Sequence, residues 1–157
     1  MPKYLTLSSG NITVVDEDVY EWASRYRWQE HSGGYAFRCT TVEGKRGHIR
    51  LHRAIMQTPK GMDTDHIDHD RLNNLRSNLR ICTHSENLQN MAGPNRDSRT
   101  GIRGVSILAT GKYQAQICLN GERIYLGVFA TLGNADAAAK QGRRRLMTHS
   151  PECKEVC

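Results

Sequence analysis

The 157-residue sequence contains no apolar run approaching the roughly 18 residues that a membrane-spanning helix requires. Its first ten residues also lack the hydrophobic stretch of a secretion signal. Its five cysteines are an odd number without any Cys-x-x-Cys pair, which argues against a disulfide framework and against a zinc ribbon. We therefore expect a soluble cytoplasmic protein from a reducing compartment, with no membrane partner.

Aromatic residues are absent from residues 38–112, although the chain has ten of them. Such a stretch can build only a thin core, so it must lean on neighbouring segments or on a metal ion and polar contacts. Charge is uneven too: residues 1–60 carry nine Lys or Arg against six Asp or Glu, residues 61–95 three against five, and residues 96–157 ten against five. Basic flanks favour a polyanionic partner, and the acidic centre favours a metal ion.

The sequence pattern of residues 1–50 predicts a small mixed scaffold of short strands and one helix. Strand candidates are residues 4–7 and 12–15, around the turn sequence Ser-Ser-Gly-Asn, and the later pair 35–42 and 48–51. Asp16 can cap a short helix between them. The apolar face of that helix repeats at i, i+3, i+4 and i+7 and consists of Val19, Trp22, Ala23 and Tyr26.

Residues 51–91 predict a second region, which opens with a short helix over 51–57. Two short strands, residues 65–67 and 79–82, are joined by the polar loop 68–78.

A capping box, Thr83-His84-Ser85-Glu86, follows the second strand. It predicts a helix from His84 to about Met91, with Leu88 and Met91 turned inward. Residues 92–101 have the composition of a linker, and residues 149–157 that of a disordered tail.

Asn120-Gly121 is the strongest hairpin signal in the chain, because both turn positions require positive φ. A turn there creates one apolar and one polar face on both strands. The predicted pairs are Ile117 with Ile124, Ala115 with Leu126, Tyr113 with Val128, Cys118 with Arg123, and Gln116 with Tyr125. With a third strand in residues 102–108, the polar face stays open.

A helix capped by Thr131 should cover the apolar face of this sheet. Its stripe of small or apolar residues consists of Ala135, Ala138, Ala139 and Leu146. Residues 102–148 thus predict a three-stranded antiparallel sheet on one helix, and the whole chain is α+β.

Four polar side chains carry the chemistry that a nuclease needs. His66 can accept a proton from water at neutral pH. Asp65 and Asn87 offer hard oxygen ligands that suit a single Mg²⁺ ion, with Mn²⁺ as an alternative. Asn78 is placed to hold the imidazole in its useful tautomer. Because neighbouring residues on a strand point to opposite faces, Asp65 and His66 can share a site only at a twist or a strand end.

Two other metal sites fit the same stretch less well. A calcium loop over Asp63–Asp70 has Ile67 at a ligand position and lacks the turn glycine. The histidines and Cys82 do not match the spacing of a usual zinc finger or knuckle. Arg71, Arg76 and Arg80 either meet phosphates or offset the local carboxylates.

The motif resembles the HNH homing endonucleases of phages and introns, whose core is the ββα-metal fold. The resemblance covers residues 48–95 and rests on His52-Arg53, Asp65-His66-Ile67-Asp68, Asn73-Asn74, Ser77-Asn78-Leu79-Arg80 and Ser85-Glu86-Asn87-x-x-Asn90. It implies His66 as general base, Asp65 and Asn87 as metal ligands, and Asn78 as the residue that orients His66. It also implies a phage-like origin in a prokaryotic host, double-stranded DNA as substrate, and products with 5′ phosphate and 3′ hydroxyl.

Residues 101–147 resemble the APETALA-two-type DNA-binding domain of plants, which is also appended to phage HNH nucleases. The resemblance rests on Gly104-Val105, Gly111-Lys112-Tyr113-x-Ala115-x-Ile117, Arg123-x-Tyr125-Leu126-Gly127-x-Phe129 and the Ala135–Ala139 run. It implies that the open sheet face enters the major groove through Arg103, Gln116, Arg123 and Tyr125. Gln114 shares that face, while Lys112 and Arg80 are predicted phosphate contacts.

The favoured function is a metal-dependent DNA endonuclease targeted by the C-terminal sheet. Two alternatives stay open: a DNA-binding regulator that does not cleave, and a nuclease that processes RNA. A single such centre cuts one strand, so a monomer would nick DNA and a dimer could cut both strands. No small-molecule substrate is expected.

Overall fold

The computed structural model describes residues 1–42, 44–91 and 93–152, and the chain divides into two compact units between Thr83 and His84. This division falls inside residues 51–91, which the sequence predicted as one nuclease core. The class is α+β, as predicted. No helix in the described part of the chain has the length and apolar character to cross a membrane.

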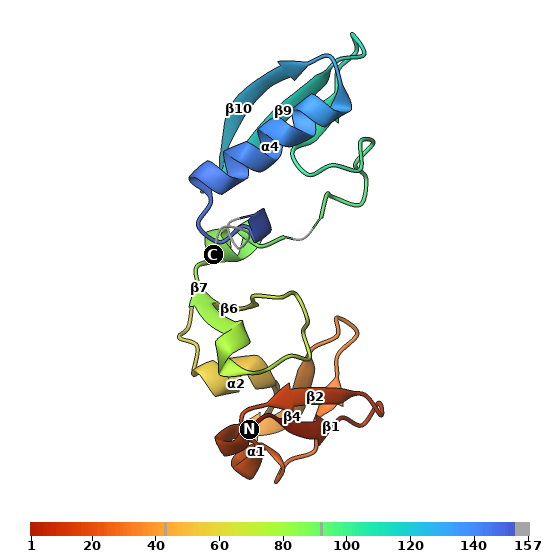
Figure 1. Ribbon diagram of the computed structural model, residues 1–157. Coiled ribbons are helices and arrows are strands. Elements are labelled where there is room, and N and C mark those ends of the chain that lie inside the picture. The colour runs from red at the N-terminus through yellow and green to blue at the C-terminus, as the bar shows by residue number, and fades with distance from the viewer. Residues whose placement is uncertain (43, 92, 153–157) are drawn as a thin grey trace. The chain divides into compact units, whose positions relative to one another are not determined.

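The first unit contains most of the short strands (Figure 1). Its elements are β1 (Lys3–Thr6), β2 (Ile12–Val15), α1 (Glu17–Ala23), β3 (Gln29–Glu30), β4 (Ala36–Val42), β5 (Lys45–Arg50), α2 (Leu51–Met56), β6 (Asp63–His66), the 3-10 turn η1 (Arg76–Asn78) and β7 (Leu79–Cys82). They form a β1–β2 hairpin, a sheet of order β3-β4-β5 and a β6–β7 pair, all antiparallel.

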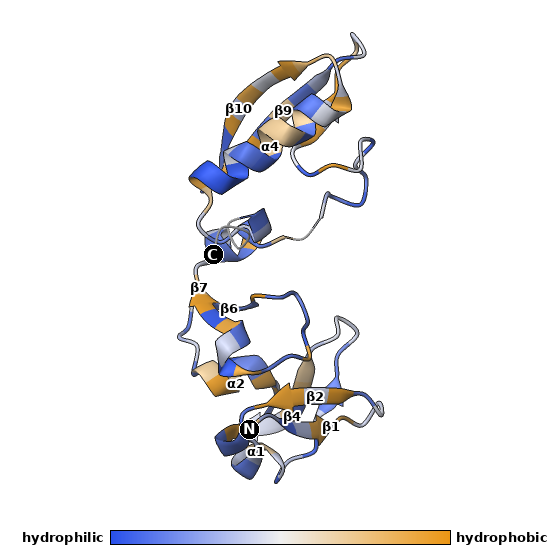
Figure 2. Cartoon of the chain, in the orientation of Figure 1, coloured by the Kyte–Doolittle hydropathy of each residue, from blue (hydrophilic) through white to orange (hydrophobic). Residues whose placement is uncertain are grey.

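One hydrophobic core holds the first unit together. Its buried members are Leu5, Leu7, Val15, Val19, Ala23, Trp28, Ala36, Leu51, Ile55 and Leu79. Leu79 belongs to β7, so the β6–β7 pair shares this core with the N-terminal scaffold. Three of its members, Leu51, Ile55 and Leu79, come from the aromatic-free stretch 38–112. Because these aliphatic side chains pack against Trp28 and its neighbours, this stretch shares the core of the N-terminal segment. The loop between β6 and β7 is mostly hydrophilic (Figure 2).

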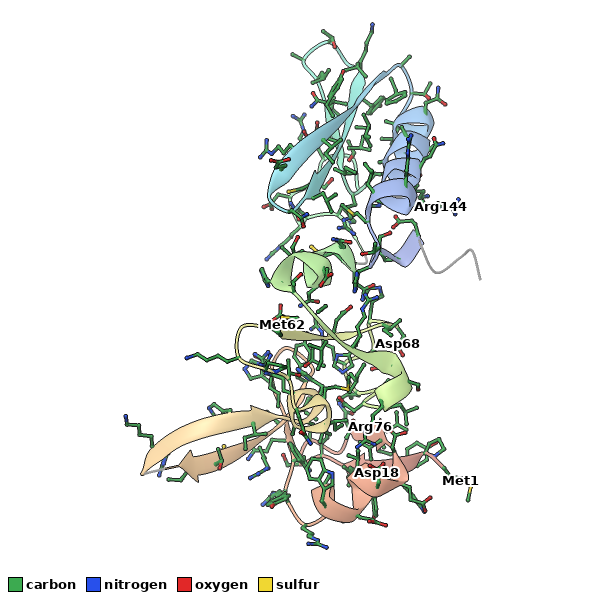
Figure 3. The ribbon with its side chains drawn as sticks, turned by 90° about the vertical axis from the view of Figure 1, so that its left-hand side faces the viewer. Met1, Asp18, Met62, Asp68, Arg76 and Arg144 are labelled. Atoms are coloured by element: carbon green, nitrogen blue, oxygen red, sulfur yellow. The ribbon has the colours of Figure 1, made fainter. Side chains whose placement is uncertain are left out.

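The α1 helix differs in two details from the prediction. Asp16 occupies the N-cap position, but its carboxylate accepts the backbone N–H of Arg76 at 2.8 Å and caps no N–H of its own helix. The Arg76 side chain lies against Asp18 (Figure 3). Tyr26 is 47% exposed and carries the Arg38 guanidinium 4.1 Å above its ring, so it is not part of the apolar face.

The second unit contains α3 (His84–Gln89), β8 (Val105–Ile107), β9 (Tyr113–Leu119), β10 (Glu122–Phe129) and α4 (Leu132–Leu146). Its three strands form the predicted antiparallel sheet, and α4 packs along it (Figure 1). Asn120 and Gly121 both have positive φ, at 52° and 85°, as the hairpin turn requires. Thr131 accepts the N–H of Asn134 at 3.3 Å and so caps α4 as predicted.

The hairpin register follows the prediction next to the turn and departs from it farther away. Ile117 pairs with Ile124 and Gln116 with Tyr125, as expected. A bulge at Leu126 then shifts the ladder, so that Ala115 faces Gly127 and Tyr113 faces Phe129.

Several residues expected inside the second unit are exposed. Leu88 and Met91 are 48% and 42% exposed, whereas Gln89 is buried, so α3 turns a different face inward from the predicted one. On α4, Leu146 is exposed and Arg143 takes the buried position. The Arg143 guanidinium is compensated there by the Glu152 carboxylate at 2.5 Å.

The first four residues of the predicted disordered tail, 149–152, are ordered. Ser150 is fully buried and Glu152 is held by Arg143, so residues 149–152 are packed against the unit. Residues 153–157, the remainder of that prediction, lie outside the described residues.

Candidate active site

Asp65 and His66 are the last two residues of β6, and both are buried. Asp65 pairs across the ladder with Arg80, and His66 pairs with Leu79. The Arg80 Nε and Nη2 atoms donate to Asp65 Oδ2 at 2.9 and 2.6 Å. Arg80 was predicted to contact DNA, but its guanidinium here neutralises the carboxylate predicted to bind the metal.

His66 is held by Asn74, not by Asn78. The His66 Nε2 atom lies 3.2 Å from Asn74 Oδ1. Asn74 is completely buried, and its Nδ2 atom donates to the Thr13 hydroxyl at 2.8 Å and to the Arg71 carbonyl at 3.4 Å. The Thr13 hydroxyl in turn donates to the Leu72 carbonyl at 2.7 Å.

This chain of hydrogen bonds fixes the His66 tautomer. The Arg71 carbonyl can only accept, so the atom that faces it must be the Asn74 amide nitrogen. The Asn74 oxygen therefore faces His66, and a neutral imidazole must donate its Nε2–H to that oxygen. Nδ1 is consequently the basic nitrogen of the ring. Burial lowers the pKa of His66 below its ordinary value, which favours this neutral form.

Asn78 instead fastens the loop between β6 and β7. Its Nδ2 atom donates to Asp68 Oδ1 and to the Asn73 carbonyl, both at 2.8 Å, and its Oδ1 accepts the Asp68 N–H at 3.0 Å. The predicted bond from Asn78 to His66 is therefore replaced by the bond from Asn74. Asn78 acts on His66 only indirectly, because it shapes the loop that carries Asn74.

The same loop is attached to β2, far away in the sequence. Val14 N–H donates to the Leu72 carbonyl at 3.0 Å, and Asn74 N–H donates to the Val14 carbonyl at 2.9 Å. The sequence places Asn73-Asn74 in the predicted polar loop 68–78, and no local pattern there indicates burial. The signal that was available is the family motif itself, which includes Asn74.

Two rings, those of His52 and Tyr35, lie against the His66 imidazole. The His52 ring centroid lies 5.1 Å away and that of Tyr35 5.9 Å away, while His52 and Tyr35 are themselves 5.1 Å apart. Burial, followed by the nearby charge of His66, lowers the pKa of His52 to about 3. The His52 ring beside His66 is therefore neutral at physiological pH.

The donor chemistry for a metal ion is present in part. Asp65 supplies the carboxylate oxygen that Mg²⁺ prefers, although Arg80 competes for it. The described residues hold no cluster of three His, Cys, Asp or Glu side chains suited to a metal. Asn87 lies on α3 in the second unit, so its pairing with Asp65 stays a prediction.

The predicted DNA-contact residues of the second unit fall into two groups. Gln114, Gln116, Arg123 and Tyr125 lie on one sheet face by their register, and Tyr125 is 62% exposed. Lys112 is exposed just before β9. Their contact with DNA stays a prediction.

Arg103 is engaged elsewhere. Its guanidinium donates to the carbonyls of Leu88, Gln89 and Met91 at 2.7–3.0 Å, and so caps the C-terminal end of α3. Burial lowers its pKa. Arg103 therefore stabilises the second unit. Its guanidinium binds these backbone carbonyls, whereas the sequence predicted that it contacts a DNA base.

Comparison with known proteins shows what this site is similar to. Residues 57–89, which include Asp65, His66, Asn74 and Asn78, match the family model described as HNH endonuclease. This stretch of the chain is therefore similar to HNH endonucleases. No solved structure matches the chain.

One similar protein comes from a virus. The chain is 31% identical over 127 residues to "Uncharacterized HNH endonuclease L560" of Acanthamoeba polyphaga mimivirus. The aligned part is 75% of this chain and 63% of that relative. The chain thus spans less than two thirds of the relative's length.

Proposed function

We propose that this protein is a metal-dependent DNA endonuclease of the HNH type, with His66 as its general base. The observation that carries the proposal is the buried chain Thr13–Asn74–His66, because it directs the Nε2–H of the imidazole to Asn74 and makes Nδ1 the acceptor. A tautomer held this firmly is what a general base needs. The match of residues 57–89 to HNH endonucleases supports the same assignment.

In the proposed reaction, His66 Nδ1 takes a proton from water and the resulting hydroxide attacks phosphorus. The bond from phosphorus to the 3′ oxygen breaks, leaving a 5′ phosphate and a 3′ hydroxyl once that oxygen takes a proton from solvent. Asp65, with Asn87 as the sequence predicts, would hold the divalent ion. When bound, the ion supplies positive charge beside the scissile phosphate and the leaving oxygen.

Targeting by the second unit is part of the proposal. Its polar sheet face offers the amides of Gln114 and Gln116 and the Arg123 guanidinium, which are the groups that read adenine and guanine edges in the major groove. Tyr125 and Lys112 complete an APETALA-two-type surface, on which Lys112 would meet phosphate.

One observation favours a second candidate, a DNA-binding protein that does not cleave. The ion pair between Arg80 and Asp65 occupies the carboxylate that the metal needs. The two candidates separate in one assay, in which supercoiled plasmid is incubated with the full chain and Mg²⁺ or Mn²⁺, and the nicked and linear products are resolved.

The endonuclease predicts nicking with either metal and none with EDTA, with 3′ hydroxyl ends at the break. Stable DNA binding without strand breakage under every metal condition would favour the non-cleaving candidate. Cleavage that persists in EDTA would contradict the metal assignment.

A further inference from the structure

The β4–β5 hairpin presents a row of basic side chains that no role described above uses. Side chains alternate between the two faces of a strand, so Arg46, His48 and Arg50 share one face of β5, about 7 Å apart from one to the next. All three are exposed. The hairpin, coloured orange, extends away from the rest of the first unit (Figure 3).

Neutral residues face this row across the ladder. Its cross-strand partners on β4 are Thr41 for Arg46, Cys39 for His48 and Phe37 for Arg50. Glu30 on β3 pairs with Ala36, which alternation places on the opposite face, and its carboxylate is bonded to Ser9 and Asn11. Glu43 lies outside the described residues. Among residues 1–42 and 44–91, no carboxylate forms an ion pair with Arg46 or Arg50.

The Arg50 end of this row lies near His66. The Arg50 guanidinium lies 5.4 Å from the centroid of the Tyr35 ring, and that of Arg71 lies 4.8 Å from it. The same ring is 5.9 Å from the His66 ring. Two exposed cations therefore flank the aromatic ring beside the proposed general base.

We propose that Arg46, His48 and Arg50 form a track for the DNA backbone that ends at Arg71 beside His66. The segment is thus a second DNA-binding surface, within the first unit and separate from the C-terminal sheet. A two-stranded ribbon can lie along a duplex groove, and arginines that face neutral cross-strand partners suit phosphates. The inference rests on the proposed function for its substrate, but it concerns binding and not bond cleavage.

The test is the salt dependence of binding in EDTA, measured by fluorescence anisotropy with the full chain and a labelled DNA duplex of arbitrary sequence. In the variant Arg46→Gln/Arg50→Gln, the slope of log K against log salt should fall by about 2, because two phosphate contacts are lost. Lys45→Gln is the matched control, since Lys45 neighbours Arg46 in the sequence but lies on the other face of the hairpin. Its slope should equal that of the unsubstituted protein.

An unchanged slope in the double variant, or an equal fall in Lys45→Gln, would overturn the track. Arg46→Lys/Arg50→Lys guards against a folding defect, because it keeps both charges and should keep the slope. Plasmid cleavage with Mg²⁺ is scored separately. If the salt slopes change as expected while the unsubstituted protein does not cleave DNA, the proposed nuclease activity is refuted and the DNA-binding track is supported. If the protein cuts but the slopes do not change, the track fails alone.

Discussion

Replacing Asn74 with Ala should damage catalysis more than it damages stability. Asn74 is fully buried, and its loss deprives His66 and the Thr13 hydroxyl of a partner in the core. Each buried polar group left without its partner costs about 1–3 kcal/mol, so the free energy of unfolding of the first unit should fall by about 3 kcal/mol. The imidazole also loses the bond that fixes its tautomer, which should slow DNA cleavage by about 10- to 100-fold.

Thr13→Val is the matched control for this variant. It removes the hydroxyl that bonds to Asn74 and to the Leu72 carbonyl, so it should destabilise the unit by a similar amount. It leaves the bond between Asn74 and His66 in place. Urea unfolding gives the stability of both variants, and single-turnover plasmid nicking at a temperature where both are folded gives the rate.

The expected result is a large loss of rate in Asn74→Ala and a small one in Thr13→Val at comparable stability. Equal rates in the two variants would refute the reasoning, because Asn74 would then act only as a structural residue.

Three further predictions concern stability. The unfolded chain takes up a proton at His52 near pH 6.5 but the folded chain only at about 3, so the unfolding free energy should fall by about 2 kcal/mol from about pH 8 to about pH 5. His52→Phe should remove this part of the pH dependence in urea titrations, and a change at the exposed His31 should not. Arg103→Gln should lower the melting temperature without lowering the salt slope of DNA binding by about 1, as the loss of a phosphate contact would. Gly104→Ala should cost about 2 kcal/mol or more in thermal unfolding, because Gly104 has φ +79° and its new Cβ would meet the Gln116 carbonyl.

Local signals in the sequence predicted local structure well. The turn at Asn120-Gly121 and the cap at Thr131 are confirmed, because each depends on the φ angles or hydrogen bonds of a few neighbouring residues. The register fails only beyond the bulge at Leu126, where packing within the sheet, and not the turn, decides the pairing.

The site was predicted less completely, because its partners are distant in the sequence. Asn74 reaches Thr13 across 61 positions, and no pattern around Asn74 indicates that contact. Arg103 likewise caps a helix that ends 14 residues earlier, which its position before a strand does not reveal. The partners of a long charged side chain such as Arg103 are set by the tertiary fold, and its neighbours in the sequence do not indicate them.

The most direct test of the account compares His66→Ala with the unsubstituted protein on supercoiled plasmid in Mg²⁺, at DNA concentrations that saturate both. We predict that the variant binds with nearly unchanged affinity and leaves the plasmid intact, while the unsubstituted protein nicks it. Cleavage by the variant at a comparable rate would contradict the assignment of His66 as the base, and with it the central claim.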